Sequence, residues 1–229
     1  MKRVSVTPLM HTTNEITEVP CNILVTGFVS TENGLNASDA LVRSLMNDLP
    51  VSLTDAQYLI HFQLVDANTN DLRPTLEALL REVQPAVCVF VGQAPGRNNI
   101  TLERSASNLR FTGPPLQPGE APPSDVIHVS GPEVCMATLL HMDVMVEKLQ
   151  AAGIPAALSS DAGNSLCNQI LYEGLQYATN HGGQPRCGFV HIPALPQQVI
   201  ERWPGYPFMP LDMMRAAMAI ILLELVRDA

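Results

Sequence analysis

The sequence predicts an α/β protein, a three-layer α/β/α sandwich with a mostly parallel central sheet. Short apolar runs of strand length alternate with amphipathic helical patterns, and this alternation is typical of parallel sheets covered on both faces. The strand runs are nearly continuously apolar, as buried parallel strands are. Composition agrees, because 46% of the 229 residues are hydrophobic and only 15% are charged, which allows a sizeable core.

Apolar runs with the length of strands occur along the whole chain. The most hydrophobic is Ala86–Val91, which leads into a loop that begins at Gly92. Such runs, bounded by glycine or proline, favour strands over exposed loops. The expected strands cover residues 23–26, 58–65, 86–91, 154–158 and 187–192.

Between these runs, apolar residues recur at helical spacing. The first helix has Asn36 or Ser38 as its candidate cap, and Pro74 is acceptable in the first turn of the second. A proline-rich stretch over 113–131 has little periodicity and predicts a long irregular segment. The expected helices begin at 36 and cover 71–83, 134–152, 166–179 and 211–226.

Charge and terminal sequence limit the partners and the location. The net charge of -9 argues against binding to nucleic acid or to an anionic membrane, since such proteins present basic surfaces. The first twenty residues are polar and lack the apolar core of a secretory signal. We expect a cytoplasmic protein with an N-terminal extension over 1–20 and a single α/β domain over 21–229.

The five cysteines give no sign of a disulfide framework or a metal site. Their number is odd, they are widely spaced and they contain no CxxC pair, and the histidines show no HExxH spacing. We therefore expect no metal site. The cysteines are Cys21, Cys88, Cys135, Cys167 and Cys187.

A small set of residues combines nucleophilic and proton-transfer chemistry. In open α/β sheets, sites gather beyond the carboxyl ends of the strands. Cys167 lies in the first turn of an expected helix, where a thiolate is favoured, and His191 lies at the end of an expected strand. A cysteine–histidine pair oriented by a carboxylate is the arrangement of a cysteine hydrolase. Glu103 could supply that carboxylate.

Each of these residues also has a structural interpretation. Cys167 could be a helix packing residue, and His191 could bond only to backbone. Glu103 could be a solvated acid beside Arg104, and Phe28 could belong to the core. Spacing alone does not decide between these interpretations and an enzyme.

Several blocks of the chain resemble the pyroglutamyl peptidase I family, the pyrrolidone-carboxylate cysteine peptidases. The resemblance covers about residues 22 to 226, and the later blocks agree with the family in order and spacing. The cysteine and histidine blocks are the most specific. The blocks are Ile23–Phe28, Gly92–Arg97, Ile100–Arg104 with Asn108, Met145–Leu149, Gly153–Ala156, Asp161–Gly163, Leu166–Asn168 and Gly188–Pro193 with Leu195-Pro196.

The resemblance implies an enzyme that removes an N-terminal pyroglutamyl residue from peptides without a metal or cofactor. It places the catalytic glutamate, cysteine and histidine on Glu103, Cys167 and His191. It also implies that Phe28 packs on the pyrrolidone ring and that Gln93 lines the ring pocket. Family members are often homo-oligomers, with tetramers common, so a homotetramer is expected.

The substrate-binding blocks depart from the family pattern. The second phenylalanine of the usual GFEPFGG loop corresponds to Thr31, and the arginine of the family's DARIPD segment falls at Gly113. An alternative is therefore a homologue that binds a peptide terminus or small lactam without efficient turnover. A flavodoxin-like nucleotide-binding module is disfavoured, because Gly27 is followed by Phe28 and no phosphate-cradling glycines.

Overall fold

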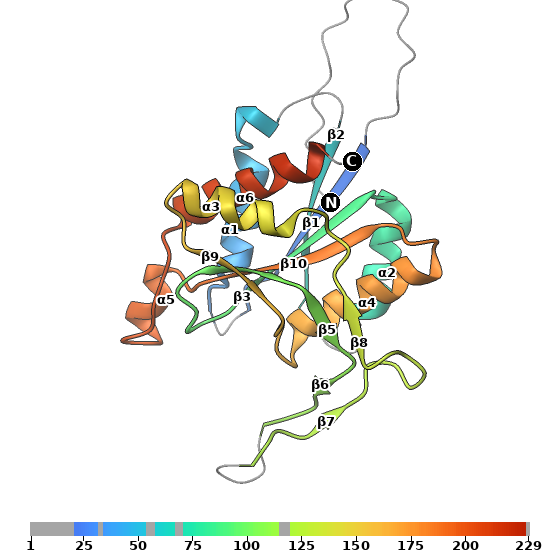
Figure 1. Ribbon diagram of the computed structural model, residues 1–229. Helices are drawn as coiled ribbons and strands as arrows, with labels where there is room; N and C mark the ends of the chain where they lie inside the picture. Colours follow the sequence, from blue (N-terminus) through green and yellow to red (C-terminus); the bar gives the residue numbers. More distant parts are fainter. Residues whose placement is uncertain (1–20, 32–33, 54–57, 67–70, 115–119, 228–229) are drawn as a thin grey trace, which may run out of the picture.

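The computed structural model describes residues 21–31, 34–53, 58–66, 71–114 and 120–227, and the expected extension over 1–20 lies outside these ranges. Six strands form the central sheet, in the order β2-β1-β3-β10-β4-β9 (Figure 1). Their bounds are β1 Cys21–Phe28, β2 Tyr58–Val65, β3 Val87–Gln93, β4 Ile100–Glu103, β9 Ala156–Ser159 and β10 Arg186–Ile192.

The sheet is parallel except at one place. Strand β1 runs parallel to β2 and β3, β3 parallel to β10, and β4 parallel to β9. Strands β10 and β4 are antiparallel, with Phe189 opposite Glu103 and His191 opposite Thr101. The expected mostly parallel sheet is confirmed, and its single reversal lies at the candidate catalytic residues.

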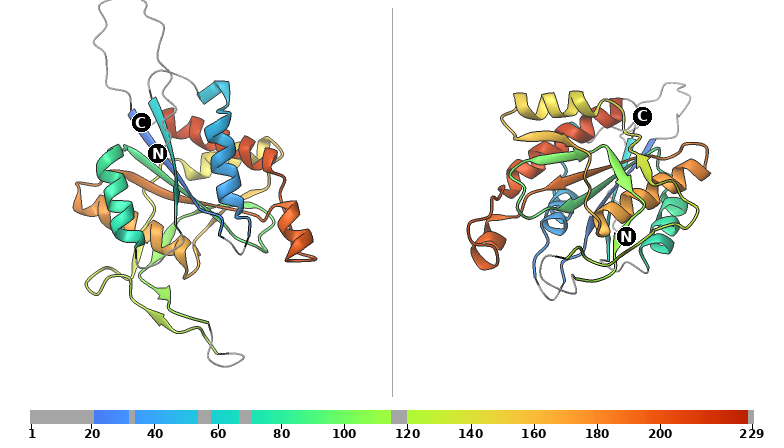
Figure 2. Two further views of the ribbon diagram at one scale, coloured as in Figure 1. Left: turned by 180° about the vertical axis from the view of Figure 1, so that it is seen from behind. Right: turned by 60° about the horizontal axis from the view of Figure 1, so that its bottom comes forward.

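Helices cover both faces of the sheet and complete three layers (Figure 2). One apolar core joins the sheet to α1, α3 and α6, and a second joins it to α2 and α4. These cores form because each helix turns one apolar stripe towards the sheet. The helices are α1 Ala37–Asn47, α2 Leu72–Val83, α3 Met142–Ala151, α4 Leu166–Asn180, α5 Pro196–Glu201 and α6 Leu211–Arg227.

The connection from β1 to α1 is fixed by two side chains. The Asn36 Oδ1 accepts a hydrogen bond from the Ser38 backbone N–H at 2.9 Å, so Asn36 caps the helix as expected. The Ser38 Oγ accepts from the Phe28 N–H at 3.0 Å. The end of the first strand is therefore tied directly to the start of the first helix.

The expected helix over 134–152 is wrong over residues 134–141. Residues Val134–Met136 form strand β8, which pairs antiparallel with β5 (Ser105–Ser107). Val134 and Met136 are exposed whereas Cys135 is buried, which is the two-residue alternation of a strand. The helix α3 begins only at Met142, after His141 in a left-handed conformation with φ 53°.

An arm projects from the body, and the sequence did not predict its strands. This arm, described over residues 105–114 and 120–136, contains β5, β8 and the short antiparallel pair β6 (Arg110–Phe111) and β7 (Ser124–Asp125) (Figure 1). The Phe111 N–H donates to the carbonyl oxygen of Asn164 at 2.7 Å, which docks the arm beside the start of α4. Among the helices described, none is long and apolar enough to cross a membrane.

Candidate active site

Glu103 and His191 form a hydrogen-bonded pair inside the protein. The distance from His191 Nδ1 to Glu103 Oε1 is 2.8 Å. Glu103 is 0% exposed and His191 is 4% exposed. The interpretation of Glu103 as a solvated acid is therefore wrong, and the His191 ring bonds to a carboxylate. Its structural alternative, a ring bonded only to backbone, is wrong as well.

The reversed strand β4 produces this pair. Because β4 is antiparallel to β10, its carboxyl end lies opposite Phe189, two residues before His191. Glu103 is the last residue of β4, so it lies at the carboxyl end of its own strand, as expected for a site residue. Because β4 runs opposite to β10, this end lies beside the interior of β10 and not beyond the carboxyl end of β10. Thr101 and Glu103 share a face because side chains alternate along a strand.

Two further side chains hold the Glu103 carboxylate. Its Oε1 accepts from Thr101 Oγ1 at 2.9 Å and from Arg97 Nη1 at 2.5 Å, and the same Arg97 nitrogen contacts Thr101 Oγ1. Burial by itself raises the pKa of Glu103, but hydrogen bonds to His191, Ser159 and Arg97 and the charge of His191 outweigh it and lower that pKa to about 2. Glu103 is therefore a carboxylate at neutral pH.

The ionised partner fixes the state of the imidazole. A carboxylate can only accept, so the hydrogen lies on His191 Nδ1 and the Nε2 lone pair is left for another group. Burial lowers the pKa of His191, although Glu103 opposes that shift. The Phe189 ring packs on the imidazole with centroids 4.5 Å apart. His191 is therefore a neutral base held in one orientation.

Cys167 is the second residue of α4, as expected, and its sulfur lies beside the end of β3. A Cβ atom on Gly92 would lie 2.7 Å from Cys167 Sγ, and Gly92 is opposite His191 in the β3–β10 register. The thiol and the imidazole thus approach the same backbone segment from two elements that are distant in the sequence.

The charge state of Cys167 differs from the expectation. Burial, followed by the charge of Glu103, raises the pKa of this thiol to about 12, whereas Arg97 lowers it. The helix start alone predicted a thiolate, but desolvation has the larger effect. The resting group is a thiol, and a neighbouring base must remove its proton before it can attack.

The expected substrate residues lie at the ends of neighbouring strands. Phe28 is 4% exposed and belongs to a buried apolar cluster, and Cys167 packs against the same cluster. Gln93 ends β3, and its Oε1 accepts from the Ala37 N–H at 2.6 Å and from Gln198 Nε2 at 2.7 Å. These bonds occupy the oxygen of Gln93 and leave its amide N–H groups as donors.

Two residues at the site were not expected from the sequence to act there: Thr101 and Gln198. Arg97 belongs to the Gly92–Arg97 block that resembles the family. Gln198 is 1% exposed and also donates to the Leu35 carbonyl at 2.7 Å, so it fixes Gln93 from the α5 side. Recognising Ile100–Glu103 as a strand could have found Thr101, because residues two apart on a strand share a face.

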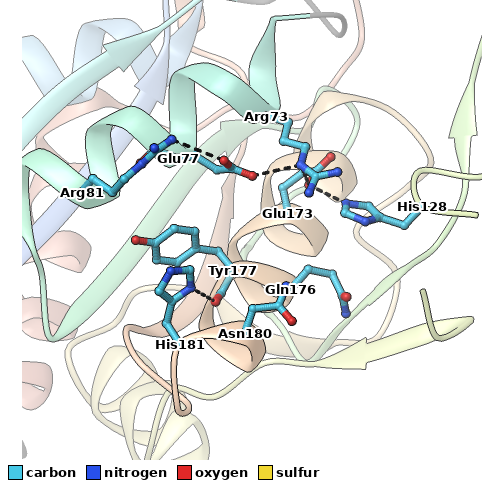
Figure 3. Close-up of a pocket in the computed structure, with 9 residues that line it drawn as sticks. All are labelled: Arg73, Glu77, Arg81, His128, Glu173, Gln176, Tyr177, Asn180 and His181. Atoms are coloured by element: carbon cyan, nitrogen blue, oxygen red, sulfur yellow. Dashed lines mark hydrogen bonds and ion pairs between the residues drawn. The ribbon is translucent and has the colours of Figure 1, made fainter. Parts of the chain in front are cut away.

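A separate polar cavity of about 170 Å³ lies between α2 and α4. Figure 3 shows that its charged groups pair with one another: His128 Nε2 lies 2.7 Å from Glu173 Oε2, and Arg73 contacts both Glu77 and Glu173. None of the residues that line it is an expected site residue. Over the described ranges, no group of three His, Cys, Asp or Glu residues could hold a metal ion.

A carboxylate-bound imidazole near a cysteine at a helix start suits acyl transfer to sulfur. Together with the three-layer fold, it defines the class of α/β cysteine hydrolases. The family model described as pyroglutamyl peptidase matches residues 21–227. The chain belongs to this family and is a cysteine peptidase.

Relatives and solved structures agree with this assignment. Pyrrolidone-carboxylate peptidase 1 of Photorhabdus laumondii is 33% identical over 213 residues, which is 90% of this chain and 94% of the relative. A pyrrolidone-carboxylate peptidase 1 of Ralstonia nicotianae is 35% identical over 86% of this chain and 89% of its own. The crystal structure of pyroglutamyl peptidase I from Bacillus amyloliquefaciens superposes with a TM-score of 0.78 at 29% identity, covering 90% of this chain and 97% of that one.

Proposed function

We propose that this chain is a cysteine exopeptidase that removes an N-terminal pyroglutamyl residue from peptides. The observation that carries the proposal is the 2.8 Å bond between His191 and the buried Glu103, with Cys167 at the adjoining helix start, in a chain of the pyroglutamyl peptidase family. The proposal assigns the nucleophile to Cys167, the proton carrier to His191 and the orienting carboxylate to Glu103.

In the proposed reaction, His191 Nε2 takes the Cys167 proton as the sulfur attacks the carbonyl carbon of the pyroglutamyl residue. Backbone N–H groups at the start of α4 are the candidates to stabilise the resulting oxyanion. The intermediate collapses, the carbon–nitrogen bond breaks, and the imidazolium returns its proton to the departing amine. Water then hydrolyses the thioester, with His191 as base, and Glu103 stabilises the imidazolium in both steps.

The pyrrolidone ring is flat and uncharged and has no free amine. We assign its apolar contact to Phe28 and its hydrogen bonding to the amide N–H groups of Gln93, since the Gln93 oxygen is already engaged by Ala37 and Gln198. Neutral donors and an aromatic face suit such a ring better than an acidic anchor does. Thr31, at the position of the family's second phenylalanine, is exposed.

The assembly and location of the chain follow the family and the composition. We propose that residues 21–229 act as one peptidase domain, that the protein forms a homo-oligomer, with a tetramer expected, and that it works in the cytoplasm. The family match over 21–227 supports the domain. Size-exclusion chromatography with light scattering would measure the oligomer, and a monomeric mass would overturn that part of the proposal.

The decisive experiment measures release of a fluorescent amine from its pyroglutamyl amide. Wild-type protein should release it, and Cys167→Ser should abolish release without loss of the fold, as checked by circular dichroism. Cys21→Ser, a change to a partly buried cysteine on β1, is the matched control and should retain turnover. Normal turnover by Cys167→Ser, or release of unblocked amino acids instead, would contradict the proposal.

A further inference from the structure

Arg97 contacts two separate parts of the candidate site. It lies in the loop between β3 and β4, and its Nη1 is 2.5 Å from Glu103 Oε1. Its Nη2 donates to the backbone carbonyl oxygen of Asp161 at 2.6 Å. The Arg97 side chain is 27% exposed and the carboxylate it contacts is 0% exposed, so one edge of the guanidinium is enclosed.

Asp161 belongs to the loop that delivers the nucleophile. This loop joins β9, which ends at Ser159, to α4, whose second residue is Cys167. It is ordered from within, because the Asp161 N–H donates to Ser159 Oγ at 3.1 Å and the Asp161 Oδ1 accepts from the Gly163 N–H at 2.9 Å. A residue that holds the Asp161 carbonyl therefore helps to place the start of α4.

We propose that Arg97 is a positioning residue whose guanidinium joins the Glu103–His191 pair to the loop that carries Cys167. The inference rests on the proposed catalytic roles of those three residues, and it assigns to Arg97 no contact with the substrate. A guanidinium suits this bridge because its N–H groups point in fixed, divergent directions. One nitrogen serves the carboxylate while the other serves the loop.

The charge of Arg97 also acts on both reacting groups. Burial is the largest influence on each of them, raising the pKa of Cys167 and lowering that of His191, and Arg97 lowers both. The opposing charges that face His191 are Glu103 on β4 and Asp161 in the β9–α4 loop, and both raise its pKa. Loss of the Arg97 charge should therefore raise the pKa of His191 and of Cys167 together.

The test compares Arg97→Gln, Arg97→Lys and the control Arg104→Gln, which changes an exposed arginine on the same stretch of chain. Three quantities are measured: the pH profile of kcat/KM, the rate at which iodoacetamide alkylates Cys167 at pH 8, and the thermal unfolding midpoint. Alkylation needs no substrate, so it reports on Arg97 even if the proposed peptidase activity fails.

For Arg97→Gln we expect kcat to fall about 10- to 100-fold, the size expected for misplaced reacting groups. The acid limb of kcat/KM should move to higher pH, because His191 must be neutral to accept a proton and its pKa is raised. Alkylation of Cys167 should slow, because the pKa of the thiol is raised as well. Arg97→Lys keeps the charge but cannot span both partners, so it should restore the acid limb and the alkylation rate while kcat stays low. Arg104→Gln should change none of these.

Two results would overturn the inference. One is an Arg97→Gln protein with wild-type kcat. The other is an Arg97→Gln protein in which kcat falls only in proportion to the fraction of unfolded molecules. In that case the acid limb of kcat/KM and the alkylation rate of the folded molecules would match wild type, as expected for an arginine with a purely structural role.

Discussion

Gly92 and Cys167 approach each other so closely that no side chain fits between them. A Cβ atom on Gly92 would lie 2.7 Å from the Cys167 sulfur, and Gly92 itself lies opposite His191 in the sheet. Because Gly92 has no side chain, the Cys167 thiol can lie against β3, next to the β10 strand that carries the His191 imidazole.

Gly92→Ala should displace the thiol. The new Cβ would also lie 2.6 Å from the Phe189 ring, and contacts this short force a shift of side chain or helix. We expect kcat to fall at least about tenfold and the unfolding free energy to drop by about 1–3 kcal/mol. Gly113→Ala is the control, because its nearest neighbour would be Pro123 Cγ at 3.6 Å. An alanine at position 92 with full turnover would contradict this account of the site.

Acid should weaken the fold through Glu103. The pKa of Glu103 is about 2 in the folded protein and ordinarily 4.5, so its ionised form stabilises the fold above pH 4.5 and this contribution is lost as the pH falls towards 2. The stability advantage of wild type over Glu103→Gln should thus shrink by roughly 2–3 kcal/mol between pH 6 and pH 2.5.

Urea unfolding at several pH values would measure this difference. The control is Glu147→Gln, which changes an exposed glutamate of α3 and should show no comparable pH-dependent difference. A constant difference between wild type and Glu103→Gln over the whole range would mean that Glu103 is not held ionised by His191 and Arg97.

Asn168→Ala should loosen the arm. The Asn168 side chain is 1% exposed, donates to the carbonyls of Ser107 and Leu109 at 2.8 and 2.9 Å, and accepts from the Ser107 N–H at 2.8 Å. Its loss leaves buried backbone groups without partners, and we expect about 2–4 kcal/mol of destabilisation. Hydrogen exchange should rise first at residues 105–111, whereas Asn180→Ala, an exposed control at the end of α4, should leave exchange there unchanged.

Thr31→Phe should strengthen binding of the pyrrolidone ring. Thr31 is exposed and pairs with Gly34 in an isolated bridge, so a larger side chain has room. A second aromatic contact contributes about 1–3 kcal/mol, which is roughly a tenfold to hundredfold decrease in KM. The effect on kcat should be smaller, since the contact exists in both ground and transition states. Thr31→Val controls for loss of the hydroxyl, and an unchanged or higher KM for Thr31→Phe would show that the ring pocket closes differently.

The sequence predicted most of the sheet because strands buried on both faces are continuously apolar, as Ala86–Val91 is. It did not reveal β4, whose Thr101 and Glu103 interrupt the apolar pattern. Those polar residues are buried because they belong to the site, so the function itself obscured the strand. Residues 134–136 were assigned to a helix because three alternating residues are too few to separate a strand from the helix that follows.

The sequence proposes which residues form the candidate site, but it does not predict their physical state. The resemblance picked out Glu103, Cys167 and His191, but burial depends on the whole fold, and burial decides that Cys167 is a thiol at rest. The bond between Glu103 and Arg97 was not predicted either, because Arg97 reaches the carboxylate from a loop whose path no local pattern fixes. Hydrogen bonds such as that between Gln93 and Gln198 join residues 105 positions apart and leave no trace in spacing.

The reversed strand β4 determines at what point of its synthesis the chain can assemble the candidate active site. Glu103 and His191 are 88 positions apart, and β4 reaches the sheet only by pairing with β10 and β9. Contacts of such long range form late, after the loops between them have closed. A nascent chain that has emerged only through α4 already carries the thiol but has no imidazole to activate it. We therefore expect the newly made chain to acquire hydrolytic capacity in one step, after β10 has left the ribosome.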